Sequence, residues 1–236
     1  MLIIFDVDGT LIGGEETDWK CFDDAFHQVA GFQFPPKFFD DLHEVTAKAI
    51  VHQALPNENE AVRIDNEERV RDECLARLTD AHRSEENVFF PTRGAPKLLS
   101  YLSDRNDFSV AIATGDWEDT INFKCRVAGI EIDKYPLATS SDCYARSEII
   151  TLAASRANWS LDNSIYIGDG LWDYQAAITL GIPFVAVGHR IERLLDAGAI
   201  HSLPSLDPEH FVEWFKAFKA AENCSGGDVV PNKTQN

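Results

Sequence analysis

The chain opens on a continuous apolar run, Leu2–Phe5, that ends at two acidic residues. A run without polar alternation is typical of a strand that is buried on both faces of a parallel sheet. Asp6 and Asp8 follow it, and strand side chains alternate with a period of two, so both carboxylates point to the same side. Ligands of open α/β sheets bind just beyond the carboxyl ends of strands. Two carboxylates at such a place repel each other unless a cation lies between them, so this segment predicts a metal site.

The pattern changes to helical periodicity from about residue 18 to residue 83. Apolar residues recur there three and four positions apart in three stretches, and the second of these predicts a helix over 38–50. No stretch of this region is a convincing strand. The sequence therefore predicts an α-helical insert at 15–88, which is entered through a Gly-rich hinge at 9–14.

Strands and helices alternate in the remainder of the chain. The predicted strands are 2–5, 108–114, 137–139, 164–168 and 184–187. The predicted helices between them are 95–102, 117–128, 146–156 and 171–180. This alternation predicts an α/β fold with a doubly wound parallel sheet, formed by 1–14 and 89–221 as one discontinuous domain. The tail 222–236 has little to bury and is predicted to be disordered.

Composition and charge narrow the classes of function. Hydrophobic residues make up 44% and charged residues 25% of the chain, which is ordinary for a globular protein. The formal net charge of -18 argues against broad binding of nucleic acids or anionic membranes, because both need clustered Lys and Arg. An anionic substrate would therefore need a local positive site. The sequence shows no signal peptide, membrane span or Cys-x-x-Cys pair, and a cytoplasmic protein is predicted.

Four groups of candidate residues fall at predicted strand ends or helix starts. They are Asp6 with Asp8, Thr114 before Gly115, Arg146, and Asp169 with Asp173. Each group alone has an ordinary structural explanation. An Asp after a strand is often a turn or cap residue, and an acid in a first helical turn is stabilised by the helix dipole. Their combination and order are therefore more informative than any one of them.

In this order the four groups resemble the haloacid dehalogenase (HAD) superfamily of phosphohydrolases, in particular its phosphoglycolate phosphatase-like and β-phosphoglucomutase-like group. Residues 6–11, Asp-Val-Asp-Gly-Thr-Leu, resemble the first motif, and residues 168–173, Gly-Asp-Gly-Leu-Trp-Asp, resemble the fourth. Thr114 matches the Ser/Thr of the second motif, and Arg146 falls where the Lys or Arg of the third belongs. The resemblance implies a Rossmann-like core, and the helical insert is similar in position to a C1-type cap.

The resemblance also implies roles for these residues in the hydrolysis of a small phosphorylated metabolite. Asp6 would be the nucleophile that forms an aspartyl-phosphate, and Asp8 would protonate the leaving alkoxide and later activate water. Mg²⁺ would be bound by Asp6, the backbone carbonyl of Asp8 and Asp169, and Asp173 would anchor a metal-bound water or orient its neighbours. The residues implied to contact the phosphoryl oxygens are Thr10, Thr114, Gly115 and Arg146.

Two other functions stay open at this stage. A phosphomutase of the β-phosphoglucomutase type would pass the phosphoryl group from Asp6 to a second hydroxyl, and an inactive HAD scaffold would act as a binding or regulatory protein. Asp8 favours phosphate esters over the dehalogenase branch, which lacks this acid because a halide needs no proton. His189 and Arg190 follow the last predicted strand, so topology puts them near the edge of the site, but a solvated loop is the default interpretation. It assigns no substrate-selecting role to the other candidates, which are Lys20, His43, Arg93, Trp117 and Lys124.

Overall fold

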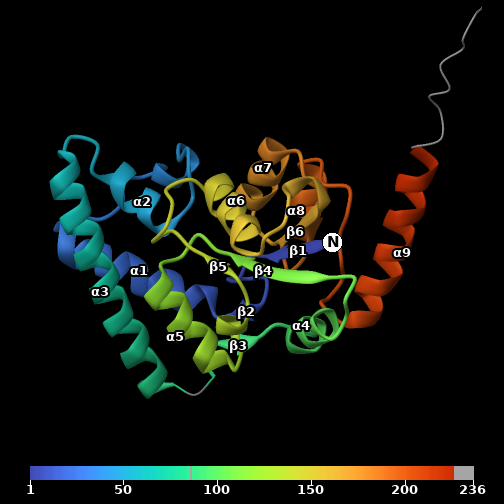
Figure 1. The fold of residues 1–236 in the computed structure, drawn as a ribbon. Coiled ribbons are helices and arrows are strands. Elements are labelled where there is room, and N and C mark those ends of the chain that lie inside the picture. Colours follow the sequence, from blue (N-terminus) through green and yellow to red (C-terminus); the bar gives the residue numbers. More distant parts are fainter. Residues whose placement is uncertain (86, 226–236) are drawn as a thin grey trace, which may run out of the picture.

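A five-stranded parallel sheet forms the centre of the computed structural model, which describes residues 1–85 and 87–225 (Figure 1). The strands lie in the order β5-β4-β1-β6-β7. Their bounds are β1 Leu2–Phe5, β4 Ser109–Ala113, β5 Leu137–Ala138, β6 Ser164–Gly168 and β7 Phe184–Ala186. Leu2 lies opposite Ser109 on one side and Ser164 on the other, so β1 is the middle strand. The predicted doubly wound sheet is confirmed, and each strand end lies within one residue of its predicted position.

Helices cover both faces of this sheet (Figure 1). On one face lie α4 (Ala95–Ser103), α5 (Glu118–Ala128) and α9 (Pro208–Ser225). On the other lie α6 (Arg146–Arg156), α7 (Leu171–Leu180) and α8 (Ile191–Asp196). Ile3 and Phe5 pack in the first layer, whereas Leu2 and Ile4 pack in the second. The run is apolar at every position because each face of β1 has its own hydrophobic core.

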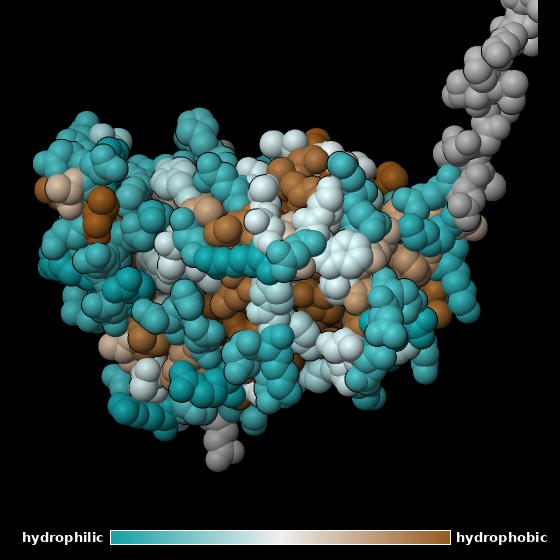
Figure 2. All heavy atoms as spheres, viewed as in Figure 1, coloured by the Kyte–Doolittle hydropathy of each residue, from teal (hydrophilic) through white to brown (hydrophobic). Residues whose placement is uncertain are grey.

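The cap is formed by α1 (Glu15–Ala30), α2 (Ala47–Ala54) and α3 (Glu60–Ser84), which lie at the left of Figure 1. Hydrophilic residues cover most of its surface in the view of Figure 2. The helix predicted over 38–50 is wrong over 38–46, since only the 3-10 turn η1 (Phe38–Asp40) precedes α2, which begins at Ala47. The backbone of Val45 and Ala47 bonds to the core instead, through Arg146 Nη2 at 3.0 Å and the Gly115 carbonyl at 2.7 Å.

Two short strands that the sequence did not predict connect cap and core. β2 (Ile12–Gly13) pairs antiparallel with β3 (Phe90–Pro91), so both crossings of the chain run side by side. A Cβ on Gly13 would lie 2.6 Å from the Phe90 ring, and one on Gly14 would lie 2.5 Å from the Val88 carbonyl oxygen. Gly14 also has a φ of 119°, which side chains disfavour. The two glycines therefore allow this close connection.

The C-terminal helix closes one face of the core. Phe108 before β4 contacts Phe215 of α9, with ring centroids 5.0 Å apart. The helix extends to Ser225, so the first four residues of the predicted disordered tail are helical, and the remainder, 226–236, lies outside the described residues. Two further 3-10 turns are η2 (Ile132–Lys134) and η3 (Leu161–Asn163). None of the described helices combines the length and apolarity needed to cross a membrane.

Candidate active site

Asp6 and Asp8 lie beyond β1 at the wall of a cavity of about 520 Å³ between cap and core. The Asp6 N–H donates to the Ile167 carbonyl at 2.9 Å, so pairing with β6 continues up to this acid. The chain then turns sharply at Gly9, which has a φ of 78°. A Cβ on Gly9 would lie 2.4 Å from an oxygen of Asp169. Glycine at this position therefore brings the turn against the acid that follows β6.

The guanidinium of Arg146 binds two acids of the site. Its Nη1 donates to Asp6 Oδ1 at 3.0 Å and to Asp173 Oδ1 at 2.8 Å. All three side chains are buried. A Cβ on Gly115 would lie 2.2 Å from Arg146 Nη2, so this glycine makes room for the guanidinium. Arg146, the first residue of α6, thus supplies a local positive charge in a protein whose net charge is strongly negative.

Asp6, Asp169 and Asp173 form a buried acidic cluster in which one carboxylate oxygen of each lies within 4.8 Å of the others. Burial and the charge of Asp173 raise the pKa of Asp6 well above its usual range and that of Asp169 to about 8. Asp169 Oδ1 is buried and has no hydrogen-bond partner among the described residues. An unpaired carboxylate oxygen beside two further acids fits a hard divalent cation such as Mg²⁺.

A second charged cluster surrounds Lys124, which projects from α5 and is fully buried. Its Nζ lies 2.7 Å from Asp8 Oδ1, 2.9 Å from Asp18 Oδ1 and 2.9 Å from Asp116 Oδ2. Burial raises the pKa of Asp8 against the attraction of Lys124, and it raises that of Asp18 to about 7. Asp18 belongs to the cap and Asp8 to the core, so one ammonium group joins the two.

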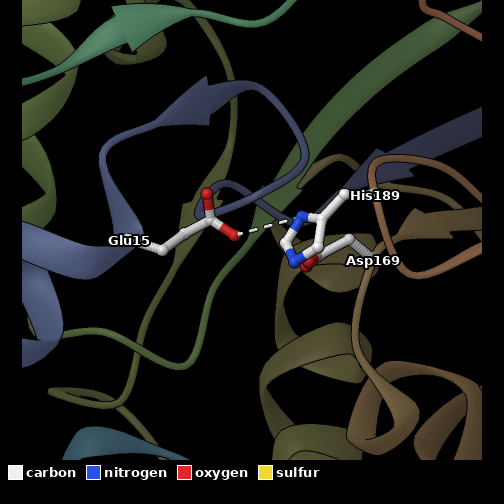
Figure 3. Close-up of side chains that lie close together, drawn as sticks. All are labelled: Glu15, Asp169 and His189. Atoms are coloured by element: carbon white, nitrogen blue, oxygen red, sulfur yellow. Dashed lines mark ion pairs between the residues drawn. The ribbon is translucent and has the colours of Figure 1, made fainter.

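A third set of charges lies close to Asp169. Arg190 Nη1 donates to Asp169 Oδ2 at 3.0 Å, and its guanidinium carbon lies 5.6 Å from the centre of the Trp172 ring. Figure 3 shows Glu15, at the start of α1, facing His189 and Asp169 from the core loops, with Glu15 Oε1 3.8 Å from His189 Nδ1. The prediction of a solvated loop holds for His189, which is exposed, but is wrong for Arg190, because the carboxylate of Asp169 draws its guanidinium inward.

Comparison with known proteins identifies the family. The family model described as haloacid dehalogenase-like hydrolase matches residues 3–187, which is more than half of the chain. The chain belongs to the haloacid dehalogenase-like hydrolases. No curated protein matches this HAD hydrolase.

Solved structures resemble this HAD hydrolase over almost its whole length. A hydrolase from Pseudomonas syringae has a TM-score of 0.70 and 19% identity, with 91% of this chain and 97% of that chain covered. A β-phosphoglucomutase from Clostridium difficile has a TM-score of 0.71 and 20% identity, with 93% and 98% covered. CbbY from Rhodobacter sphaeroides in complex with phosphate has a TM-score of 0.67 and 19% identity, with 87% and 94% covered. At sequence identities this low, these similarities establish a shared fold and nothing about the substrate.

The other predicted candidates of the HAD hydrolase divide between the site and its surroundings. Thr114 is buried at the cavity wall, where its Oγ1 accepts a hydrogen bond from the Asp116 N–H at 3.3 Å. Thr10 Oγ1 is buried without a partner among the described residues. Trp117 packs outside the cavity wall, with its indole N–H donating to Glu67 Oε1 at 3.1 Å. Lys20 and His43 are exposed on the cap, and Arg93 pairs with Asp207 at 2.8 Å.

The sequence missed the role of Lys124, although one signal for it was present. Lys124 lies on the same side of its helix as Ile121, Cys125 and Ala128, all of which are buried. A lysine on such a face is usually paired, because burying an isolated charge is costly. Asp18 and Asp116 gave no such signal, since both lie in regions with many acids.

Proposed function

We propose that this HAD hydrolase is a Mg²⁺-dependent phosphatase that cleaves small phosphomonoesters through an aspartyl-phosphate on Asp6. One observation carries the proposal. The Asp6 carboxylate lies at the cavity wall, where it accepts a hydrogen bond from the Arg146 guanidinium. It belongs to the same acidic cluster as the unpaired oxygen of Asp169. A nucleophile, a guanidinium that can hold phosphoryl oxygens and a carboxylate set suited to a divalent cation are the parts that phosphoryl transfer needs.

Asp6 and Asp8 would divide the reaction between them. Asp6 attacks phosphorus, the bond from phosphorus to the ester oxygen breaks, and Asp8 donates a proton to the departing alcohol. Asp8 then takes a proton from water as that water attacks the aspartyl-phosphate, which releases inorganic phosphate and restores Asp6. The raised pKa of Asp8 supports the proton-donating role. Thr114 and Arg146 would hold the phosphoryl oxygens, with further contacts from Gly115, which follows Thr114, and from Thr10, which follows the segment of Asp6 and Asp8.

Asp6, Asp169 and the backbone carbonyl of Asp8 would hold Mg²⁺, with Asp173 orienting the set. Bound there, the ion would neutralise negative charge on the phosphoryl oxygens. Asp173 is already fixed by hydrogen bonds from the Tyr166 hydroxyl and the Gly170 N–H, both at 2.9 Å. These bonds leave Asp173 suited to positioning the other acids.

A phosphomutase is the less favoured function. A mutase of a sugar phosphate must hold a second phosphoryl group in the cap half of its cavity. The described cap residues on the cavity wall include no Lys, Arg or His, so no cationic side chain there would neutralise that group. An inactive scaffold is also disfavoured, because all four motif positions are filled.

The test is the variant Asp6→Asn with p-nitrophenyl phosphate and Mg²⁺. We expect kcat to fall by about a thousandfold or more, because the amide cannot form the acyl phosphate. Asp133→Asn, which changes an exposed acid outside the cavity, is the matched control and should keep the wild-type rate. Wild-type activity should also be lost in EDTA and return with Mg²⁺. Near-normal turnover by Asp6→Asn would rule out the proposed mechanism.

A further inference from the structure

The cap half of the active-site cavity carries aromatic and aliphatic side chains together with acids. Its apolar wall includes Trp19, Phe22, Phe39 and Ile50. The charged cap residues on this wall are Glu15 and Asp18, both acidic. The part of the substrate that is not phosphate would lie against this surface, because the phosphoryl site is at the opposite, core wall. The chemistry of this surface would therefore determine which alcohol the cavity accepts.

The aromatic rings of this wall form a connected group. Trp19 stacks on Phe22 at 5.6 Å and meets Phe39 edge-on at 4.8 Å. Trp19 and Phe39 are each 42% exposed, so the cap itself does not cover them. Covering partly exposed rings on a cavity wall with an apolar or flat ligand removes apolar surface from water, which favours binding of that ligand. The geometry thus offers both stacking and edge contacts to a ring.

The charges of the cavity oppose a second anionic group on the substrate. Among the described residues, the cationic ones on the cavity wall are Arg146 and Arg190, which come from the core, and each already pairs with an acid of the cluster. Lys124 is fully buried and pairs with three acids. Glu15 and Asp18 are already offset by Arg190, whose Nη2 lies 3.9 Å from Glu15, and by Lys124. A carboxylate or a second phosphate in the cap half would therefore meet these acids and find no further cation among the described cap residues of the wall, which disfavours its binding.

We propose that the substrate is a phosphomonoester of an uncharged alcohol that carries an apolar ring, with one phosphoryl group and no second anionic group. The inference rests on the proposed phosphatase function and narrows it. It excludes bisphosphates and phosphoglycolate as preferred substrates. A volume of about 520 Å³ also gives room for a ring beside the phosphoryl group.

The test compares three alkyl esters whose phosphoryl chemistry is matched: phenethyl phosphate, ethyl phosphate and phosphoglycolate. All three release an alkyl alcohol, so differences in kcat/KM report mainly on binding of the remainder. We expect kcat/KM for phenethyl phosphate to exceed that for each of the others by about tenfold or more, as an added apolar group in a hydrophobic pocket typically gives. Equal or better hydrolysis of phosphoglycolate would overturn the inference and leave the phosphatase intact.

Cap variants assign the preference to the aromatic wall. Trp19→Ala and Phe39→Ala should each lower the ratio of kcat/KM for phenethyl phosphate to that for ethyl phosphate by about threefold to tenfold. Phe39→Lys should raise the relative rate with phosphoglycolate. Ile178→Ala, at a 58% exposed position on α7 outside the cavity, is the control and should leave the ratio unchanged. Circular dichroism establishes that each variant is folded.

Two outcomes distinguish failure of the proposed substrate class from failure of the proposed phosphatase function. An unchanged ratio in both folded alanine variants would overturn the aromatic-wall inference alone. A wild-type protein that hydrolyses none of the three esters, nor p-nitrophenyl phosphate, in the presence of Mg²⁺ would overturn the proposed function and the inference together.

Discussion

The ammonium group of Lys124 lies 2.7 Å from a carboxylate oxygen of Asp8, and the lysine side chain has no exposure to solvent. The same group contacts Asp18 of the cap and Asp116, so one buried cation offsets three acids from three segments of the chain. Removal of either sign of charge from such a cluster leaves the other uncompensated in a poorly solvated site. The stability of the folded protein should therefore depend on this lysine.

Lys124→Met should lower the free energy of unfolding by about 3–5 kcal/mol at pH 7, because three acids lose their only shared cation. Urea denaturation followed by circular dichroism measures the loss. Asp18→Asn in the same background should recover part of it by removing one of the repelling charges. Lys134→Met, which removes an exposed lysine paired with Glu131, should leave the denaturation midpoint close to wild type. Equal effects of the two lysine substitutions would contradict the expectation.

Asp18 should make stability depend on pH near neutrality. Burial raises its pKa in the folded protein to about 7, above the unfolded value of about 3.9. The folded state therefore binds this proton more tightly, and the stability that the group contributes is present at low pH and lost as pH rises through about 7. Relative to Asp18→Asn, the wild type should lose on the order of 1 kcal/mol of unfolding free energy between about pH 5 and pH 8.

The comparison uses urea denaturation at several pH values. The partial exposure of the Asp18 side chain, 26%, is the reason for an effect well below that of a fully buried acid. Glu16→Gln, which changes an exposed acid of the same helix, should run parallel to the wild type across this range. Parallel curves for Asp18→Asn and wild type would contradict the pKa assigned to Asp18.

Mg²⁺ should stabilise the folded protein, and the gain should depend on Asp169. A ligand that binds only the folded state adds about 2.7 kcal/mol at a concentration of about a hundred times its Kd. Thermal unfolding with Mg²⁺ and with EDTA should therefore differ for the wild type and coincide for Asp169→Asn, which lacks one of the clustered carboxylates. Asp133→Asn should keep the full shift, since this acid lies outside the cluster. A shift of wild-type size in Asp169→Asn would place the ion elsewhere.

Gly115→Ala should reduce activity by displacing Arg146. The added Cβ would lie 2.2 Å from Arg146 Nη2 and 3.1 Å from the Val45 carbonyl oxygen, so the guanidinium must move. Misplacement of a positioning group by about 1 Å can cost about a hundredfold in rate. We expect kcat/KM with p-nitrophenyl phosphate to fall by about tenfold to a hundredfold.

The control for this substitution is Gly31→Ala at the end of α1. Gly31 has a φ of 79° and open space around its Cβ position, so alanine there strains the backbone without a clash. It should lower stability and leave kcat/KM unchanged. Gly115 has no positive φ, so a similar loss of activity in both variants would point to a general loss of stability rather than to the contact with Arg146.

Much of the core and of the acidic cluster could be predicted from local pattern. The apolar run of β1, the acids after it and the motif around Asp169 are contiguous in sequence, and the carboxyl ends of neighbouring parallel strands meet by geometry. The helix over 38–50 was mispredicted because apolar spacing reports which residues face inward. It does not report whether the backbone of Val45 bonds within a helix or to Arg146.

The charged contacts that cross elements were the least predictable part of the site. Lys124 meets Asp18 only because α1 of the cap lies against α5 of the core, and Arg190 meets Asp169 only because their two loops end at one edge of the sheet. Such pairs depend on tertiary packing. The spacing of charges along a single helix or loop does not predict which element will pack against it.

The central place of β1 has a consequence for the order in which the protein folds. Its two neighbours, β4 and β6, begin at Ser109 and Ser164, so this apolar strand cannot complete its pairing until most of the chain has been synthesised. Pairing between segments so distant in sequence is slow, and an unpaired apolar strand favours aggregation in the meantime. Asp6 and Asp169 come together only when β1 pairs with β6, so a nascent chain would assemble this pair of acids late, and only β7 would remain to be added to the sheet.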